Sequence, residues 1–131
     1  MTDSFKLVEF FIKQYLASSA KQMKLVVAQD FSYYINFGEP LSFKEFTDRM
    51  WFLQSSSDVV FGELSSEDDI HFYSEFKLTL PAPNDNKQAI GLAQFVVKNK
   101  LISKVFVDYR EDADKFEEFQ NMMKKSPTVL L

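Results

Sequence analysis

The chain has 131 residues, of which 46% are hydrophobic, and its formal net charge at pH 7 is −4. This length fits one domain, and the acidic excess argues against a nucleic-acid-binding protein, which needs a basic surface to replace counterions. The absence of cysteine excludes disulfides, thiolate zinc sites and cysteine nucleophiles. No basic run favours a membrane surface, and no signal-peptide pattern or membrane-length apolar run is visible, so we expect a cytoplasmic protein.

The first third of the chain predicts two helices and a strand. Residues 4–17 carry helical periodicity over so broad an apolar face that the helix must be embedded in the fold. Ser19 and Gln22 have capping-box spacing, so a second helix is expected to start there and to run to about Ala28. Residues 30–37 alternate as in a strand. Phe31, Tyr33, Ile35 and Phe37 share one side of this strand, and Ser32, Tyr34 and Asn36 share the other.

A third helix has the clearest start signal in the chain. Ser42 is a candidate N-cap with Glu45 three residues later, and Leu41 and Phe46 have the spacing of a hydrophobic staple. The serines at 55–57 are expected to end this helix.

The rest of the chain is predicted to be mostly strand. Strands are expected at 58–64, 69–80, 87–98 and 101–109, with a loop at 81–86 and a tight turn at Asn99-Lys100. From Glu111 the pattern returns to helix, with Phe116, Phe119 and Met123 on one face. No repeat or linker divides the chain, so residues 1–131 are expected to form one α+β domain in which helices pack into a curved antiparallel sheet.

Strand parity predicts which residues face the helices. Opposed residues of an antiparallel hairpin point the same way, and their numbers have a constant sum. This places Ser74, Gly91 and Ala93 together at the centre of the inner face, on which Lys104 and Asp108 also lie. Small side chains beneath packed helices leave space, which either forms a pocket or is filled by Phe11 or Trp51. The count holds only if no β-bulge interrupts the strands.

The opposite face of the sheet is predicted to be too apolar for water and too polar for a core. Such a mixed surface is typical of a subunit contact, so we expect a homodimer through this outer face. Its expected members are His71, Tyr73, Glu75, Lys77, Ile90, Leu92, Gln94, Val96, Val105, Val107 and Tyr109.

The segment from Gly91 to Tyr109, GLAQFVVKNKLISKVFVDY, together with the order of the elements before it, resembles the nuclear-transport-factor-two-like superfamily and especially its SnoaL-like members. The resemblance covers residues 5 to about 110 and implies a cone whose concave face and helices enclose a ligand pocket, commonly in a dimer. The superfamily includes ketosteroid isomerase, whose chemistry needs an Asp base and a Tyr and Asp as oxyanion donors. Those positions fall here on Ile35 or Asn36, on Phe11 and on Ala93, so the resemblance does not extend to that chemistry.

Several polar residues are candidates for a ligand site. Asp108 on the predicted pocket face suits a general base with a raised pKa, or else it is a strand end in solvent. Lys104 suits an anionic ligand, or else it extends to water. Polar contacts with the ligand are expected from a further group of residues: Tyr15, Tyr34, Asn36, Trp51 and Ser74, with Ala93 beside them. For Tyr15 and Trp51 the alternative is packing in the core.

His71 is the only histidine, and the acidic residues Glu67, Asp68 and Asp69 precede it. Parity places His71 on the outer face, so we expect neither catalysis nor metal binding there, and the acidic run is interpreted as a solvated turn. No phosphate loop, nucleophile elbow or zinc-binding spacing occurs, so no metal and no cofactor are expected.

The leading hypothesis is therefore a dimeric pocket protein that binds a small, mostly apolar molecule in the cone. The alternative is a SnoaL-like isomerase, dehydratase or hydrolase that uses Asp108 as its base. A further alternative is an interaction module that acts through the outer sheet face. The sequence does not identify the ligand or choose between these functions, because one fold serves many of them.

Overall fold

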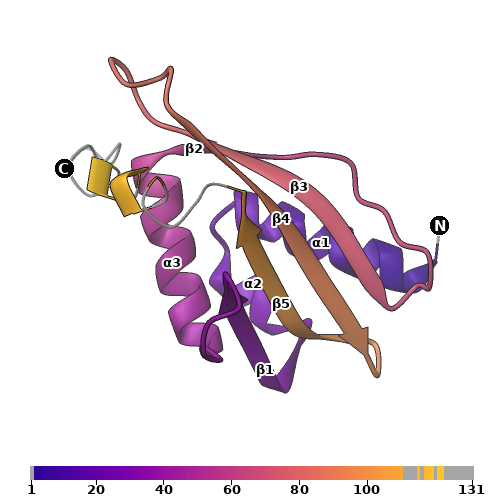
Figure 1. Cartoon of the computed structure of the whole chain (residues 1–131). Helices are drawn as coiled ribbons and strands as arrows, with labels where there is room; N and C mark the ends of the chain where they lie inside the picture. Colours follow the sequence, from indigo (N-terminus) through magenta and orange to yellow (C-terminus); the bar gives the residue numbers. More distant parts are fainter. Residues whose placement is uncertain (1, 111–114, 116, 120, 123–131) are drawn as a thin grey trace.

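The computed structural model describes residues 2–110, 115, 117–119 and 121–122. It is an α+β fold in which helices cover one face of a curved five-stranded sheet with the order β1-β5-β4-β3-β2 (Figure 1). The predicted fold class is confirmed. Within the described residues, no helix is both long and apolar enough to cross a membrane.

The N-terminal helices begin at side-chain caps. α1 (Asp3–Leu16) starts after Thr2, whose hydroxyl accepts a hydrogen bond from the backbone N–H of Phe5 at 3.1 Å. α2 (Ala20–Lys24) starts after Ser19 as expected, but it ends earlier than Ala28 because the chain has already entered β1 (Val27–Ile35). The broad apolar face of α1 explains why its central side chains are buried.

α3 (Phe43–Ser56) confirms the predicted capping box. The Ser42 hydroxyl accepts from the Glu45 N–H at 3.1 Å, and the Ser42 N–H donates to the Glu45 carboxylate at 3.2 Å. Each of these bonds satisfies a backbone or side-chain group at the helix end that would otherwise lack a partner. The helix continues through the first two of the serines expected to end it, because the hydroxyls of Ser55 and Ser56 both donate back to the carbonyl of Phe52.

The sheet departs from the prediction at one edge. β2 (Asp58–Phe61), β3 (His71–Thr79), β4 (Gln88–Lys98) and β5 (Leu101–Tyr109) are antiparallel neighbours, but β1 pairs with β5 in parallel. The long connection from β1 to β5, which includes α3, allows this parallel pairing. The predicted register of β3 and β4 is correct, with Ser74 opposite Ala93 and Phe76 opposite Gly91.

A β-bulge in β5 overturns the predicted parity of that strand. The turn at Asn99-Lys100 forms as expected, with both residues at positive φ. Val97 pairs with Ile102, but Val96 pairs with Lys104, so Ser103 is an extra residue on β5. Its hydroxyl donates to the Val96 carbonyl at 3.2 Å.

Every residue of β5 after Ser103 therefore points to the opposite face from the one predicted. Val105, Val107 and Tyr109 face the helices and are buried, whereas Lys104, Phe106 and Asp108 lie on the outer face. The expectation that Val105, Val107 and Tyr109 belong to the outer face is wrong for this reason.

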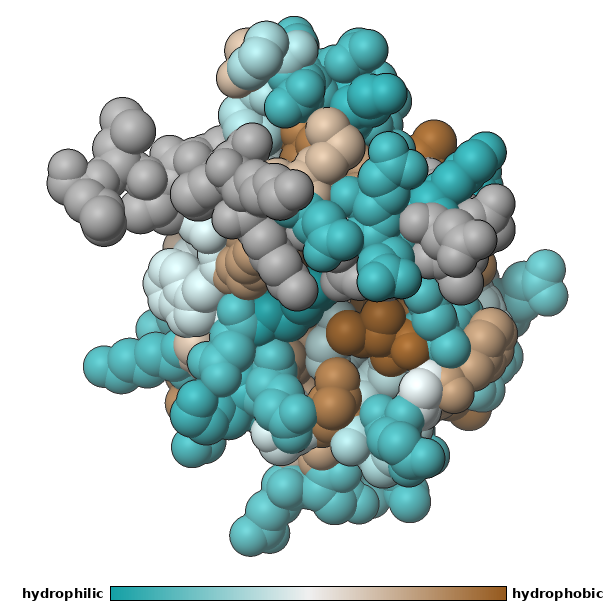
Figure 2. Space-filling model, turned by 60° about the vertical axis from the view of Figure 1, so that its left-hand side comes forward, coloured by the Kyte–Doolittle hydropathy of each residue, from teal (hydrophilic) through white to brown (hydrophobic). Residues whose placement is uncertain are grey.

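The core lies between the helices and the inner sheet face. Its fully buried large side chains come from all of these elements and include Val8, Phe11, Met23, Met50, Phe72, Leu78, Leu80, Ile102 and Val105. The side of the molecule shown in Figure 2 is mainly hydrophilic, with smaller hydrophobic patches between the polar side chains. Of the predicted C-terminal helix, residues 115, 117–119 and 121–122 are helical and Phe119 is buried, while Phe116 and Met123 lie outside the described residues.

Candidate ligand pocket

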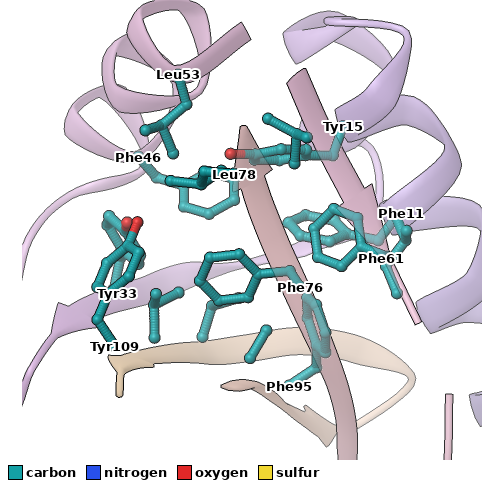
Figure 3. Close-up of a pocket in the computed structure, with 15 residues that line it drawn as sticks. Phe11, Tyr15, Tyr33, Phe46, Leu53, Phe61, Phe76, Leu78, Phe95 and Tyr109 are labelled. Carbon is teal, nitrogen blue, oxygen red and sulfur yellow. The ribbon is translucent and has the colours of Figure 1, made fainter. Parts of the chain in front are cut away.

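A pocket lies where α1 and α3 meet the inner face of the sheet (Figure 3). The cavity volume of this pocket is about 30 Å³. It is lined by Phe11, Ile12, Tyr15, Tyr33, Phe46, Leu53, Val59, Phe61, Phe76, Leu78, Ala93, Phe95, Val105, Val107 and Tyr109. None of these lining residues carries a charge, so the walls are apolar apart from the tyrosine hydroxyls.

Aromatic rings occupy much of the concave space. Phe11 of α1 stacks on Phe46 of α3, with ring centroids 5.7 Å apart, and meets Phe95 of β4 edge-on at 5.9 Å. Tyr33 meets the Phe46 ring edge-on, with ring centroids 4.8 Å apart. Of the two side chains considered for filling the pocket, Phe11 thus fills part of it. Trp51 does not, because it is 52% exposed.

The small residues at the centre of the sheet do not all leave open space. The ring of Phe76 lies directly over Gly91, so that a Cβ on residue 91 would stand 2.5 Å from Phe76 Cζ. The Ser74 hydroxyl is buried and donates to the carbonyls of Gly62 and Glu75, each at 3.1 Å. Ala93 is therefore the member of the predicted trio that lines the pocket.

The cavity volume limits what the pocket can hold. About 30 Å³ accommodates a few water molecules at most, whereas ordinary small-molecule sites measure roughly 300–1,000 Å³. A ligand larger than a few heavy atoms must therefore displace one of the lining rings.

One end of the pocket is polar. In Figure 3 the hydroxyls of Tyr33 and Tyr109 are close together, and the hydroxyl of Tyr15 also points into the pocket. Burial raises the pKa of Tyr33 well above its ordinary value, and the interaction with Tyr109 raises it further. Burial likewise raises the pKa of Tyr15. These phenols therefore stay neutral near pH 7 and keep a proton to donate.

Arg49 lies beside this polar end. It is on the face of α3 that also carries Phe46 and Leu53, and its charge partly offsets the rise in the pKa of the Tyr33 hydroxyl. The guanidinium carbon is 5.5 Å from the centre of the Phe52 ring, which is close enough for a cation–π interaction. Within the described part of the chain, its Nε and Nη2 atoms are buried and have no hydrogen-bond partner.

The predicted charged residues of the site lie on the wrong face for it. The bulge at Ser103 turns Asp108 and Lys104 to the outer face, where they are opposite Leu92 and Val96. Partial burial raises the pKa of the Asp108 carboxyl, but that carboxyl does not line the pocket. The placement on which both residues were selected is therefore wrong.

The other predicted ligand contacts are divided between different places. Tyr15 lines the pocket as expected, but Tyr34 stacks on Phe106 on the outer face, with ring centroids 4.8 Å apart. The Asn36 side chain accepts a hydrogen bond from the backbone N–H of Tyr109 at 2.8 Å and so ties the end of β1 to β5. Asn36 thus has a structural role in joining these strands.

His71 lies on the outer side of β3, as parity predicted. Its Nδ1 is 2.6 Å from Asp68, whose other carboxylate oxygen accepts the backbone N–H groups of Ile70 and His71. These hydrogen bonds, first those from His71, hold the pKa of the exposed Asp68 carboxyl below its usual range. The acidic run thus orders the turn before β3. Among the described residues, no group of three His, Asp or Glu side chains is arranged to hold a metal ion.

Sequence reasoning missed Tyr33, Tyr109 and Arg49. Tyr33 shares its strand face with Phe31, and this apolar neighbour was a usable signal that Tyr33, and not Tyr34, points inward. The bulge at Ser103 reversed the face of Tyr109, which strand parity had placed on the outer side of the sheet. Arg49 has helical spacing to Phe46 and Leu53 and so shares their apolar face, but a basic residue on a helix is ordinarily solvated and was not considered for the site.

Comparisons with known proteins identify the fold. No family model matches the sequence, and no curated protein matches it. A solved structure of a candidate SnoaL-like polyketide cyclase from Jannaschia sp. CCS1 is similar, with a TM-score of 0.70 at 8% identity, covering 95% of this chain and 94% of that one.

Two further structures give the same result. A candidate ketosteroid isomerase from Kribbella flavida DSM 17836 has a TM-score of 0.69 at 14% identity, covering 83% of this chain and 78% of that one. A nuclear-transport-factor-two-like protein of unknown function from Cytophaga hutchinsonii ATCC 33406 has a TM-score of 0.64 at 12% identity, covering 81% and 88%. The chain therefore has the nuclear-transport-factor-two-like fold of SnoaL-like proteins, and at these identities the likeness concerns the fold.

Proposed function

We propose that this protein binds a small, mostly apolar molecule in the pocket between α1, α3 and the inner sheet face. The observation that carries the proposal is the lining of the pocket, which is apolar on all sides and has tyrosine hydroxyls at one end. Ligand sites commonly combine apolar walls with a few polar groups that fix orientation. Two of the similar structures are a candidate ketosteroid isomerase and a candidate polyketide cyclase, and activities of these kinds would need a small-molecule site.

A titration followed by two-dimensional amide NMR tests this proposal. Small apolar probes, from isobutanol to toluene, are added to the labelled protein. We expect saturable shifts of amides near the pocket, such as those of Phe46, Ala93 and Val105. Shifts that do not saturate, or that lie only on the outer sheet face, would contradict the proposal.

A matched pair of variants on β4 separates the pocket from the rest of the strand. Ala93→Val adds two methyl groups to a buried pocket residue and fills much of the small cavity. We therefore expect the apparent affinity for the probes, measured from the amide shifts, to fall at least about tenfold. Leu92→Val places the same residue on the outer face and should leave probe binding unchanged. Equal binding by wild type and both variants would rule out this pocket as the binding site.

Catalysis by a pocket carboxylate is not part of the proposal. No described residue that lines the pocket is an Asp or Glu, and Asp108 lies on the outer face. The enzyme alternative has therefore lost its general base.

We also propose that the outer sheet face joins two copies of this chain. Tyr73, Leu92 and Val60 are large hydrophobic side chains exposed on this face, and the stacked pair Tyr34–Phe106 extends the surface toward β1. Basic and acidic side chains of β3 and β5 lie among them, which allows opposite charges to meet across a two-fold axis. Of the residues expected in this contact, His71, Tyr73 and Gln94 remain in the proposal, whereas Val105 and Tyr109 are buried in the core.

Light scattering coupled to size-exclusion chromatography tests the dimer. We expect the mass of a dimer for the wild type and of a monomer for Leu92→Glu, because a charge at the centre of an apolar contact is costly to bury. Leu25→Glu makes the same change at an exposed leucine after α2, outside the sheet, and should leave the dimer intact. A monomeric wild type would contradict both the dimer and an interaction function of this face.

A further inference from the structure

We infer that the polar end of the pocket binds an anionic oxygen group, held by Arg49 and the Tyr33 hydroxyl, so that the ligand is a small apolar carboxylate. This inference rests on the proposed function, because it assigns the chemical class of the molecule that enters the pocket. It adds a binding role for Arg49, which does not itself line the apolar walls.

Part of the Arg49 guanidinium is buried. Burying a donor without a partner costs free energy, and the cost is greater for a charged group. Nε and Nη2 of Arg49 are both buried and, among described residues, have no hydrogen-bond partner. Ion pairs between described residues join Lys44 to Asp48, His71 to Asp68 and Arg110 to Glu75, and Arg49 takes part in none of these.

The two buried nitrogens of Arg49 have the geometry of a bidentate donor. The N–H bonds of Nε and Nη2 point from the same edge of the planar guanidinium, and the two oxygens of one carboxylate match them in a bidentate pair. One carboxylate therefore satisfies both buried donors at once. A neutral hydroxyl or amide oxygen satisfies at most one of them well and does not neutralise the charge.

The tyrosines of the pocket contribute neutral hydrogen-bond donors. Arg49 acts against the burial that raises the pKa of Tyr33, and the raised pKa keeps the phenolic proton of Tyr33 in place for donation to an acceptor. The Tyr33 hydroxyl points into the pocket beside that of Tyr109, and Tyr15 adds a third phenol (Figure 3). The pocket thus places neutral donors next to a cation, an arrangement that favours an anionic acceptor.

The rest of the ligand would contact the apolar walls of the pocket. Beyond the hydroxyls the lining consists of the rings of Phe11, Phe46, Phe76 and Phe95 together with aliphatic side chains. Because any ligand of more than a few heavy atoms must displace a lining ring from this cavity of about 30 Å³, the pocket favours a short, compact apolar group over a long chain or a fused ring system. A short branched carboxylate meets both requirements.

The test compares two probes of the same shape that differ in charge. Isovalerate and isovaleramide are titrated separately into the protein at pH 7, and amide shifts near the pocket are followed by NMR. We expect isovalerate to bind at least about tenfold more tightly, because charge-assisted bidentate hydrogen bonds are stronger than neutral ones. The preference should weaken at high salt, and it should vanish in acid as isovalerate takes up a proton.

Variants then assign the preference to Arg49. Arg49→Gln should abolish the preference for isovalerate while retaining binding of isovaleramide, and Arg49→Lys should keep part of it because the charge remains without the planar fork. Arg110→Gln removes an exposed arginine that pairs with Glu75 at 3.1 Å and should leave the preference unchanged. Amide spectra of each variant show whether the fold is retained.

The outcomes separate this inference from the proposed function. Equal binding of the two probes by the wild type would overturn the role of Arg49 while leaving the pocket function intact, and this comparison needs no variant. A preference that persists in a folded Arg49→Gln variant would also overturn it. If neither these acids and amides nor the neutral apolar probes shift the pocket amides, the proposed function itself is wrong.

Discussion

Phe11→Ala should lower the free energy of unfolding by about 3–5 kcal/mol, the range typical of large-to-small changes of a buried phenylalanine. Phe11 is fully buried, and its ring is packed between Phe46 of α3 and Phe95 of β4. Removing the ring separates the helices from the sheet at the centre of the inner face. Equilibrium denaturation with urea measures the change.

The matched control for this substitution is Phe37→Ala. Phe37 lies in the turn after β1 and is 87% exposed, so the same chemical change removes almost no packing. We expect its effect to stay within about 0.5 kcal/mol. Similar losses for the two variants would mean that Phe11 does not hold the helices against the sheet.

Gly91→Ala should lower the free energy of unfolding by about 1–3 kcal/mol, because it overpacks the core. The added Cβ would stand 2.7 Å from Phe76 Cε1 and 2.9 Å from the backbone oxygen of Asp108. Phe76 cannot easily move away, because its ring also packs edge-on against Tyr109 at 5.3 Å. The backbone oxygen belongs to the sheet and is equally constrained.

Gly62→Ala is the control for this second prediction. A Cβ on residue 62 meets its nearest atom, the Glu75 backbone oxygen, at 3.5 Å, which is an ordinary contact. We therefore expect a small effect by urea denaturation. We also expect Phe76→Leu to make Gly91→Ala less costly in a double-mutant cycle, because the smaller side chain leaves room above residue 91. A loss at Gly91 as small as that at Gly62 would show that the ring of Phe76 yields freely.

Local signals in the sequence were sufficient for much of the fold. The capping box at Ser42 set the start of α3, and the pair Asn99-Lys100 set the turn between β4 and β5. The register of β3 on β4 also followed from counting across a loop of assumed length. In each of these cases a few neighbouring residues determine the geometry.

The site depended on a feature that counting alone does not detect. One extra residue at Ser103 reversed the faces of the remainder of β5, so Asp108 and Lys104 exchanged places with Val107 and Val105. The polarity of these four residues already favoured the observed arrangement, because burying two valines costs less than burying two charges. Giving this preference more weight than the assumed hairpin register would have placed the bulge within β5.

The environment of the Arg49 guanidinium could not have been predicted in this way. The burial of its Nε and Nη2 atoms and its proximity to the Tyr33 hydroxyl depend on how α3 packs against β1. Such contacts join residues distant in sequence through side-chain conformations, and no periodicity records them.

The most direct test of the pocket is a crystal structure determined under xenon pressure, because xenon enters apolar cavities without needing a polar partner. We expect a xenon peak between Phe46, Phe76 and Ala93, on the inner face of the sheet. Xenon found only on the outer face, or no peak in a well-diffracting crystal, would contradict the central claim that this fold encloses a usable apolar pocket.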